Sequence, residues 1–171
     1  MKKLALLFVM MVACTVGASA QKFALVDMEY VLRNVPAFEM ANEQLNQLSQ
    51  RWQKEIEAVS LESQNMYKTY QADKVFLTDE QQKKREAEIM AKEREAADLR
   101  NKYFGPEGEL NKKRDTLLKP IMDDVYNAVK KVADERGYQV VFDRASAGDI
   151  VFASPRIDIS NEVLEKLGYS R

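Results

Sequence analysis

The chain has 171 residues and nearly balanced charge, with 26 lysines and arginines against 27 aspartates and glutamates, and it has no histidine. Its one cysteine, Cys14, lies in the N-terminal segment, so the rest of the chain lacks the side chains of thiol catalysis, disulfides and Cys/His metal sites. A net charge of −1 also argues against nucleic acid as a partner, because nucleic-acid-binding surfaces are strongly basic.

The first 20 residues predict an export signal that is removed from the mature chain. A positively charged start precedes an apolar run over residues 4–16, and Ala18-Ser19-Ala20 places small residues where signal peptidase cuts. We therefore expect the mature chain to leave the cytoplasm. A lipoprotein site at Cys14 is the alternative, but the residue that opens this motif is a poor match.

Residues 21–36 predict the first part of a small β-rich body. Phe23–Asp27 is short and apolar on both faces, as is typical of a strand buried on two sides. A short helix is expected next, with Asp27 as its N-cap. It should end before Pro36, because the residue that precedes a proline is disfavoured in the helical region.

Residues 37–119 predict a long helical hairpin arm that turns near residues 76–78. Along the outgoing half, apolar side chains recur at steps of three and four residues, as in a heptad seam, with one irregularity near Trp52. The seam positions are Leu45, Leu48, Trp52, Ile56, Val59, Ser63, Met66 and Tyr70. Thr78 and Gln81 have the spacing of a capping box, so a second helix should start directly after the turn.

The returning half of the arm is more charged and is interrupted by Gly105-Pro106-Glu107-Gly108. Glycine and proline disfavour the interior of a helix, so we expect a break or kink there. The interruption lies about as far from the turn as Trp52 does. We expect the indole to fill the space that the glycines leave; the alternative is a surface tryptophan near an unrelated bend. Pro120 is expected to mark the return to the body.

Residues 120–171 predict the rest of the body. A wider apolar stripe suits a helix that packs on a sheet, and Gly137 provides its stop. Tyr138–Asp143 and Ile150–Ala153 then predict a β-hairpin, followed by a last helix. The expected fold class is therefore α+β and mostly helical, with a small β-body and a long antiparallel, coiled-coil-like arm.

A body of this size is marginal as an independent core, and its strands would leave unpaired edges. Self-association through the strands would pair the edges and enlarge the core. We therefore expect an oligomer from which the arms project, with a monomer as the alternative. The candidate interface residues are Phe23, Leu25, Val26, Val140, Val141, Phe142, Ile150, Val151 and Phe152.

This order of elements resembles the Skp/OmpH family of periplasmic chaperones. Local runs such as FALVDMEYVL near the start and GYQVVFDR and DIVFASPRIDISNEVLEKL near the end support the resemblance, which covers the whole mature chain. It implies a homotrimer in which Phe23–Asp27, Tyr138–Asp143 and Ile150–Ala153 form a small barrel. It also implies that the arms surround a cavity for unfolded outer-membrane β-barrel proteins, without nucleotide or cofactor. This chain departs from the best-known members in its slight acidity and in the interruption at Gly105–Gly108.

A chaperone that holds clients needs many weak, adaptable contacts, and methionine and tyrosine suit such contacts. The candidate client-contact residues are Met66, Tyr67, Tyr70, Phe76, Leu77, Met90, Tyr103 and Phe104. Closure of the arm's own seam is the alternative role, above all for Met66 and Tyr70. The basic run Lys83-Lys84-Arg85 is interpreted as a solvent-facing helix surface, with at most a weak contact to membrane or lipopolysaccharide.

Catalysis is not expected, because the paired carboxylates Asp123 and Asp124 point about 100° apart on a helix and no histidine supports them. The competing function is a structural or adaptor coiled-coil protein of the cell envelope. Such a scaffold should keep leucine-rich heptads throughout, whereas this seam is irregular near Trp52 and interrupted at Gly105.

Overall fold

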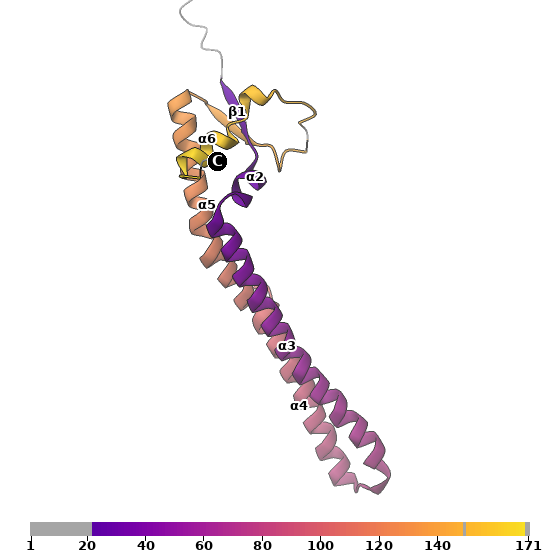
Figure 1. The fold of residues 1–171 in the computed structure, drawn as a ribbon. Coiled ribbons are helices and arrows are strands. Elements are labelled where there is room, and N and C mark those ends of the chain that lie inside the picture. The colour runs from indigo at the N-terminus through magenta and orange to yellow at the C-terminus, as the bar shows by residue number, and fades with distance from the viewer. Residues whose placement is uncertain (1–21, 149, 170–171) are drawn as a thin grey trace, which may run out of the picture. The chain divides into compact units, whose positions relative to one another are not determined.

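The computed structural model describes residues 22–148 and 150–169, so the predicted export signal and Cys14 lie outside the described residues. Its elements are β1 (Phe23–Val26), α2 (Met28–Arg33), α3 (Pro36–Asp73), η1 (Lys74–Phe76), α4 (Asp79–Phe104), α5 (Glu109–Arg136), β2 (Val140–Asp143), η2 (Pro155–Ile157) and α6 (Ser160–Lys166) (Figure 1). Long helices and a small sheet confirm the predicted α+β, mostly helical class.

The chain divides into two compact units. The arm runs from Val35 to Asp124 and extends slightly beyond the predicted range of residues 37–119 at both ends. The body combines the described residues up to Asn34 with those from Val125 onward. Helix α5 belongs to both units, because it begins in the arm and ends in the body.

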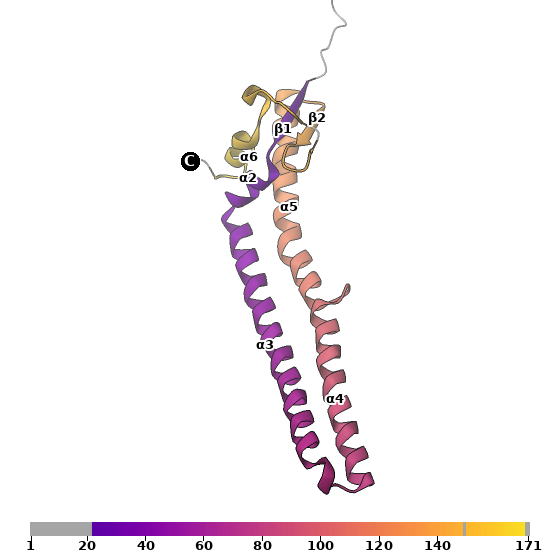
Figure 2. The ribbon, with the colours of Figure 1, turned by 90° about the vertical axis from the view of Figure 1, so that its right-hand side faces the viewer.

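In the arm, α3 and α4 run side by side in opposite directions (Figures 1 and 2), and α3 alone has 38 residues. None of the eight predicted seam residues of α3 is exposed. Four of them are buried and four are half-buried. On α4, Ile89, Ala96 and Tyr103 are buried at intervals of one heptad. The predicted seam of α3 is therefore confirmed, and α4 presents a matching seam of its own.

The turn between the two helices is closed by hydrogen bonds. The Gln81 amide donates to Thr78 Oγ1 at 3.3 Å, and the Thr78 amide donates to Gln81 Oε1 at 2.9 Å, which confirms the predicted capping box. The side-chain amide of Gln82 also donates to the carbonyl oxygens of Lys74 and Leu77, each at 3.2 Å. Together these bonds connect η1 and Leu77 to the start of α4.

Further along the arm, α4 ends at Phe104 and α5 begins at Glu109, so the predicted interruption at Gly105–Gly108 is confirmed. Helix α5 continues through Pro120, the predicted point of return to the body, and the body unit begins shortly after it, at Val125. Proline removes one helical hydrogen bond but leaves the others in place. The stripe around the fully buried Val125 and Val132 continues the helix beyond it, so packing outweighs the cost.

In the body, β1 and β2 form a two-stranded parallel sheet, with Phe23 opposite Val140 and Val26 opposite Asp143. These are the first two predicted strands, each slightly shorter than expected. The predicted β-hairpin was wrong, because Ile150–Ala153 is not a strand in the described part of the chain. A short β-branched and aromatic run becomes a strand only where another strand offers it hydrogen bonds, and over residues 22–148 and 150–169 the sheet consists of β1 and β2 alone.

The body core lies between the sheet and its helices. Its fully buried side chains are Val31, Val125, Val132, Ile159 and Val163. Gly137, at a φ of +72°, ends α5, and the Tyr138 amide then donates to the Ala133 carbonyl oxygen at 2.9 Å.

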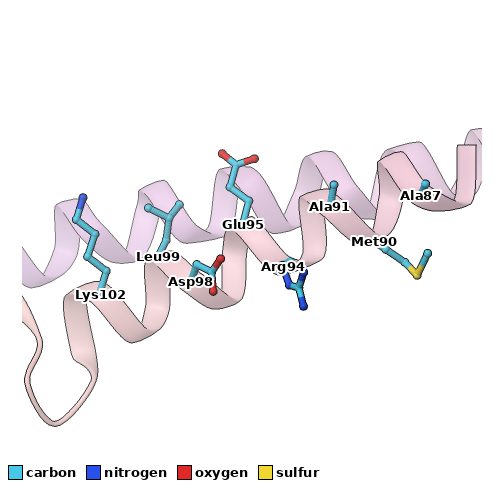
Figure 3. A pocket seen from close by; sticks show the side chains of 8 residues that line it. All are labelled: Ala87, Met90, Ala91, Arg94, Glu95, Asp98, Leu99 and Lys102. Atoms are coloured by element: carbon cyan, nitrogen blue, oxygen red, sulfur yellow. The ribbon is translucent and has the colours of Figure 1, made fainter. Parts of the chain in front are cut away.

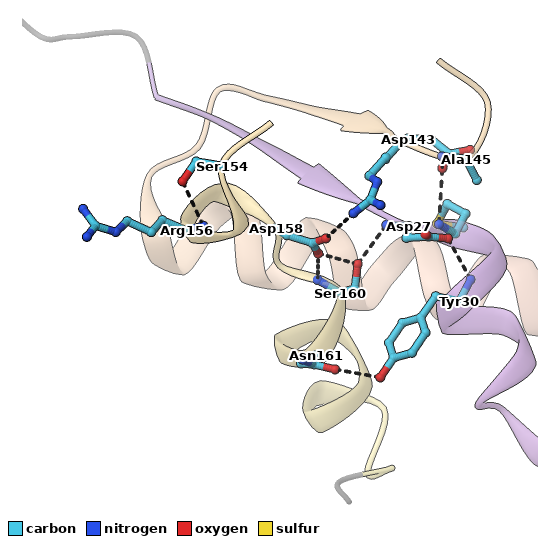
Figure 4. Close-up of polar contacts among 11 residues, drawn as sticks. Asp27, Tyr30, Asp143, Ala145, Ser154, Arg156, Asp158, Ser160 and Asn161 are labelled. Atoms are coloured by element: carbon cyan, nitrogen blue, oxygen red, sulfur yellow. Dashed lines mark hydrogen bonds and ion pairs between the residues drawn. The ribbon is translucent and has the colours of Figure 1, made fainter. Parts of the chain in front are cut away.

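Polar contacts attach both β1 and the start of α2 to the C-terminal segment (Figure 4). The Asp27 amide donates to Ser160 Oγ at 2.8 Å, and Ser160 Oγ donates to Asp158 Oδ1 at 2.6 Å. Asp27 is the N-cap of α2, as predicted, and accepts from the Tyr30 amide at 2.8 Å. The Tyr30 hydroxyl in turn donates to Asn161 Oδ1 at 3.0 Å. The N-terminal segment is therefore held by residues far away in the sequence.

Candidate functional site

The turn of the arm exposes two large apolar side chains. Val75 is 82% exposed and Phe76 is 85% exposed, while Leu77 beside them is half-buried. The capping box and the side chain of Gln82 make hydrogen bonds to the backbone of this turn, and these bonds restrain the positions of Val75 and Phe76. We call Val75 and Phe76 the tip. Exposed apolar surface on a fixed turn is suited to contact with another molecule.

An open groove of about 530 Å³ runs beside the tip, between α3 and α4. Its apolar lining is Ala58, Leu61, Met66, Leu77 and Ile89, and its polar lining is Glu62, Asn65, Thr69, Tyr70, Asp73 and Arg85. We call it the hairpin groove. The mixture of flexible apolar side chains with neutral and charged rim groups can accept apolar side chains of varied shape.

Two of the candidate contact residues, Tyr70 and Tyr103, are only 4% and 8% exposed. The Tyr70 hydroxyl donates to Glu86, and the Tyr103 hydroxyl lies 3.0 Å from both carboxylate oxygens of Glu55. Each bond joins α3 to the returning arm. These two tyrosines therefore close the hairpin, which is the alternative role considered from the sequence, and they are not available at its surface.

The same contacts change the ionisation of both phenols. The hydrogen bond to Glu86 raises the pKa of Tyr70 above its ordinary value, and burial and the negative charge of Glu86 add to the effect. Burial raises the pKa of Tyr103 first, followed by its hydrogen bond to Glu55. Both side chains are therefore neutral hydrogen-bond donors over the physiological range.

A lysine also lies in the seam. Lys92 Nζ is 2.9 Å from Glu95 and 3.1 Å from Glu62 on α3, and its side chain is only 26% exposed. The hydrogen bonds to Glu95 and then to Glu62 raise the pKa of Lys92, against the opposing effect of burial. The seam therefore contains an ion pair between the helices in addition to its apolar contacts.

The remaining contact candidates differ in exposure. Tyr67 is 52% exposed and Met90 is 62% exposed, whereas Met66 and Phe104 are half-buried. Met90 lies on an open face of α4, where Figure 3 shows Met90 and Arg94 projecting away from Glu95 and Leu99. This face belongs to one helix and encloses nothing, so it offers scattered contacts rather than a site.

The nine predicted oligomer-interface residues in the body fall into three groups, of which the half-buried one comprises Val141 and Ile150. Leu25 and Val26 are each 3% exposed and belong to the core of the single chain. The exposed group comprises Phe23, Val140, Phe142, Val151 and Phe152. Phe23 and Phe142 meet edge to face, with ring centroids 6.5 Å apart. An uncovered aromatic pair at the sheet and an exposed apolar loop are typical of a surface that another chain covers.

Comparison with known proteins identifies the family. The family model described as "Outer membrane protein (OmpH-like)" matches residues 22–167. The chain belongs to this OmpH-like family. The protein named "Chaperone protein Skp" from Yersinia enterocolitica is 25% identical over 155 residues, which cover 91% of each chain. The predicted resemblance is therefore confirmed.

The fold of this OmpH-like chain also matches a solved structure. A putative OmpH-like outer membrane chaperone from Caulobacter crescentus superimposes with a TM-score of 0.69, over 88% of this chain and 86% of its own. At 15% sequence identity, this similarity concerns the fold alone. Among the residues that the structure describes, no helix has the length and apolarity needed to cross a membrane.

This OmpH-like protein belongs to a family of chaperones and not of enzymes, in agreement with the sequence prediction. Asp123 and Asp124 are both exposed, and Asp123 pairs with Lys119 at 3.4 Å. Over residues 22–148 and 150–169, no group of three or more acidic, histidine or cysteine side chains is placed to hold a metal ion.

Sequence reasoning missed the exposed Leu61 and Val75, and it missed the acidic partners of the tyrosines. Leu61 lies off the seam, so the heptad pattern gave no signal for it. Glu86 and Glu55 could have been found, because residues about equally far from the turn face each other in an antiparallel hairpin. Tyr70 with Glu86 and Tyr103 with Glu55 both satisfy that rule around Thr78.

Proposed function

We propose that this OmpH-like protein is an ATP-independent holdase of the periplasm that binds unfolded outer-membrane β-barrel proteins and prevents their aggregation. Three lines of evidence support the proposal: membership of the OmpH-like family, similarity to a protein named as a chaperone, and the architecture of the arm. Export would follow from the predicted signal in residues 1–20. The family match begins at residue 22, just after the predicted cleavage site.

The observation that carries the proposal is the exposed apolar tip on a hydrogen-bonded turn. Val75 and Phe76 remain exposed although the arm buries its seam residues efficiently. Together with the hairpin groove, Tyr67 and Met90, they offer weak, adaptable contacts along the arm. Several such contacts made at once hold a chain without a fixed pose, because binding at one position raises the effective concentration at the next.

The proposed cavity would arise from self-association of the body. The exposed Phe23, Val140, Phe142, Val151 and Phe152 would be covered by other copies in a homotrimer, and three arms would surround the client. Arg85 of the basic run pairs with Glu88 at 3.4 Å, which leaves that run a modest source of attraction for membrane or lipopolysaccharide. The client contacts are therefore proposed to be mainly apolar.

The test is dilution of a urea-unfolded outer-membrane protein into buffer, with light scattering measured with and without this protein. We expect the scattering to fall as the chaperone concentration rises, without ATP. Val75→Ser with Phe76→Ser should weaken client binding roughly tenfold, because two apolar side chains lose their burial in the complex. Lys113→Ser with Asp115→Ser, at exposed positions of α5, is the matched control and should leave the affinity unchanged.

Unchanged scattering at excess protein would contradict the proposal and favour the adaptor function. Suppression by both variants with equal affinity would keep the holdase function but remove the tip from the client site. Native mass spectra of both variants establish that any loss of affinity is not a loss of assembly.

A further inference from the structure

Two irregularities of the arm meet at one place. On α3, two consecutive four-residue steps of the seam join at Trp52, where a regular heptad pattern would alternate three and four. Opposite it, the returning arm is interrupted at Gly105–Gly108. The Trp52 ring stacks on the ring of Tyr103, with centroids 4.7 Å apart and planes inclined by 4°, and it meets Phe104 edge-on at 6.4 Å.

At the interruption the chain leaves the helix after Phe104, forms a tight loop and re-enters a helix at Glu109. The Gly105 amide donates to the Asn101 carbonyl oxygen at 2.9 Å, and the Gly108 amide donates to the Gly105 carbonyl oxygen at 2.9 Å. A Cβ atom built on Gly108 would lie 2.8 Å from the carbonyl oxygen of Tyr103, so Gly108 has returned to the point of departure. Figure 2 shows this loop projecting sideways while α4 and the first turns of α5 follow one line.

The seam on the returning arm keeps its phase across the loop. Ile89, Ala96, Tyr103, Leu110 and Leu117 follow one another at intervals of seven residues, and each is buried or half-buried. When the four looped residues are left out, Tyr103 and Leu110 are three helical positions apart. Positions three and seven apart both lie on the same face of a helix. Residues Gly105–Gly108 therefore lengthen the polypeptide without contributing residues to the helix, and the seam positions on either side of them stay on one face.

Tyr103 is held from α3 at two points. Trp52 covers its ring, and Glu55, about one helical turn further along, accepts from its hydroxyl at 3.0 Å. The Lys102 ammonium also lies 5.2 Å from the Tyr103 ring centroid. The three atoms nearest to a Cβ built on Gly105 or on Gly108 belong to Asn101, Tyr103 and the loop itself, and none belongs to the indole. The indole thus packs beside the loop, on the last turn of α4.

We propose that Gly105–Gly108 is a four-residue insert looped out of one returning helix, and that the Trp52–Tyr103–Glu55 contacts lock this joint against bending. The interruption then leaves the register of α4 and α5 on α3 unchanged and does not act as a hinge. The inference concerns the arm alone and does not depend on what the arm binds.

The first test deletes Gly105–Gly108 from the full chain. A looped-out insert can be removed without moving Leu110 or Leu117 relative to α3, so the thermal midpoint should stay within about 2 °C of the parent or rise. The matched control deletes Ala91–Arg94 inside α4. It shifts the following seam residues by roughly 6 Å and 40°, and should lower the midpoint by about 5 °C or more. If the loop deletion lowers the thermal midpoint as much as the control deletion does, the proposal that Gly105–Gly108 is a looped-out insert is wrong.

The second test measures the stiffness of the joint. Spin labels at Glu93→Cys and Lys113→Cys, in a Cys14→Ser background, span the joint from exposed positions. We expect a narrow distance distribution in the parent, an equally narrow one after loop deletion or Leu61→Ala, and a broad one after Trp52→Ala. A broad distance distribution in the parent would establish a hinge and contradict the proposed lock. A Trp52→Ala distribution as narrow as the parent's would show that the Trp52 contacts do not lock the joint.

Discussion

At the scale of single residues, the arm is closed by pairs that join a neutral tyrosine to a carboxylate. Such a pair satisfies a buried hydroxyl without burying two opposite charges, so it avoids the larger desolvation cost of an ion pair. Tyr70 with Glu86 lies near the turn, and Tyr103 with Glu55 lies near the loop. The two pairs therefore specify register at two distant levels of the hairpin.

Because of these pairs, we expect the stability of the arm to decrease at alkaline pH. Because hydrogen bonding and burial raise the pKa of both phenols, the folded arm keeps protons that the unfolded chain loses above about pH 10. The contribution of these two groups to the free energy of unfolding is therefore fully present below that pH, and it is lost as the pH rises through their folded-state pKa values. We expect the free energy of unfolding in urea, followed by circular dichroism, to fall less steeply between pH 9 and pH 11 in Tyr70→Phe with Tyr103→Phe. Tyr67→Phe, at a half-exposed position, should keep the parental slope; equal slopes in all three proteins would contradict this assignment.

At the scale of elements, the start of α4 offers a measurable single contact. Thr78→Ala removes the acceptor for the Gln81 amide and should lower the free energy of unfolding by about 1 kcal/mol, whereas Thr78→Ser keeps the hydroxyl and should cost much less. Chemical denaturation of the two variants provides the comparison. Equal losses would show that the methyl group, and not the hydrogen bond, stabilises the turn.

Local signals explain which elements could be predicted from the sequence. The heptad steps of α3, the capping box at Thr78 and the stop at Gly137 each depend on neighbours within a few residues, and each is confirmed. The parallel pairing of β1 with β2 and the loss of the strand at Ile150–Ala153 depend on partners distant in the sequence. Short apolar runs predict strand propensity but not the partner, which decides whether a strand forms.

In the candidate site, too, the features that depend on nearby residues could be predicted and those that depend on distant partners could not. Periodicity placed Tyr70 on the seam, and the structure buries it there. The sequence could not separate Tyr103, which also lies on the seam, from surface contacts, because the charged residues of the returning arm obscure its heptad. Phe76 was identified because it lies at the turn, where no seam partner can reach it. Val75, its equally exposed neighbour, would have followed from the same reasoning.

At the scale of the whole molecule, the body presents apolar surface that a single chain does not cover. Val151 is fully exposed and Phe152 is 85% exposed, although the same body fully buries five core side chains. The Ile159 amide donates to the carbonyl oxygen of Leu25 at 2.8 Å, so one edge of β1 is already occupied. In the described residues β2 pairs with β1 alone, and its outer edge is open to a further strand.

The open edge and the exposed apolar surface predict self-association, and the resemblance to the family implies that the assembly is a trimer. We therefore expect native mass spectrometry of the mature protein to show a homotrimer, with Phe142→Ser and Phe152→Ser together shifting it to monomers. Both aromatic side chains are exposed in the single chain, so their removal should weaken assembly without opening the body core, and the helical circular dichroism should persist at low temperature. Val75→Ser with Phe76→Ser removes a similar exposed apolar surface from the arm and should keep the trimer mass. If the body variant stays trimeric while the tip variant dissociates, the copies associate through the arms, and the proposed cavity between the arms would be occupied by the assembly itself.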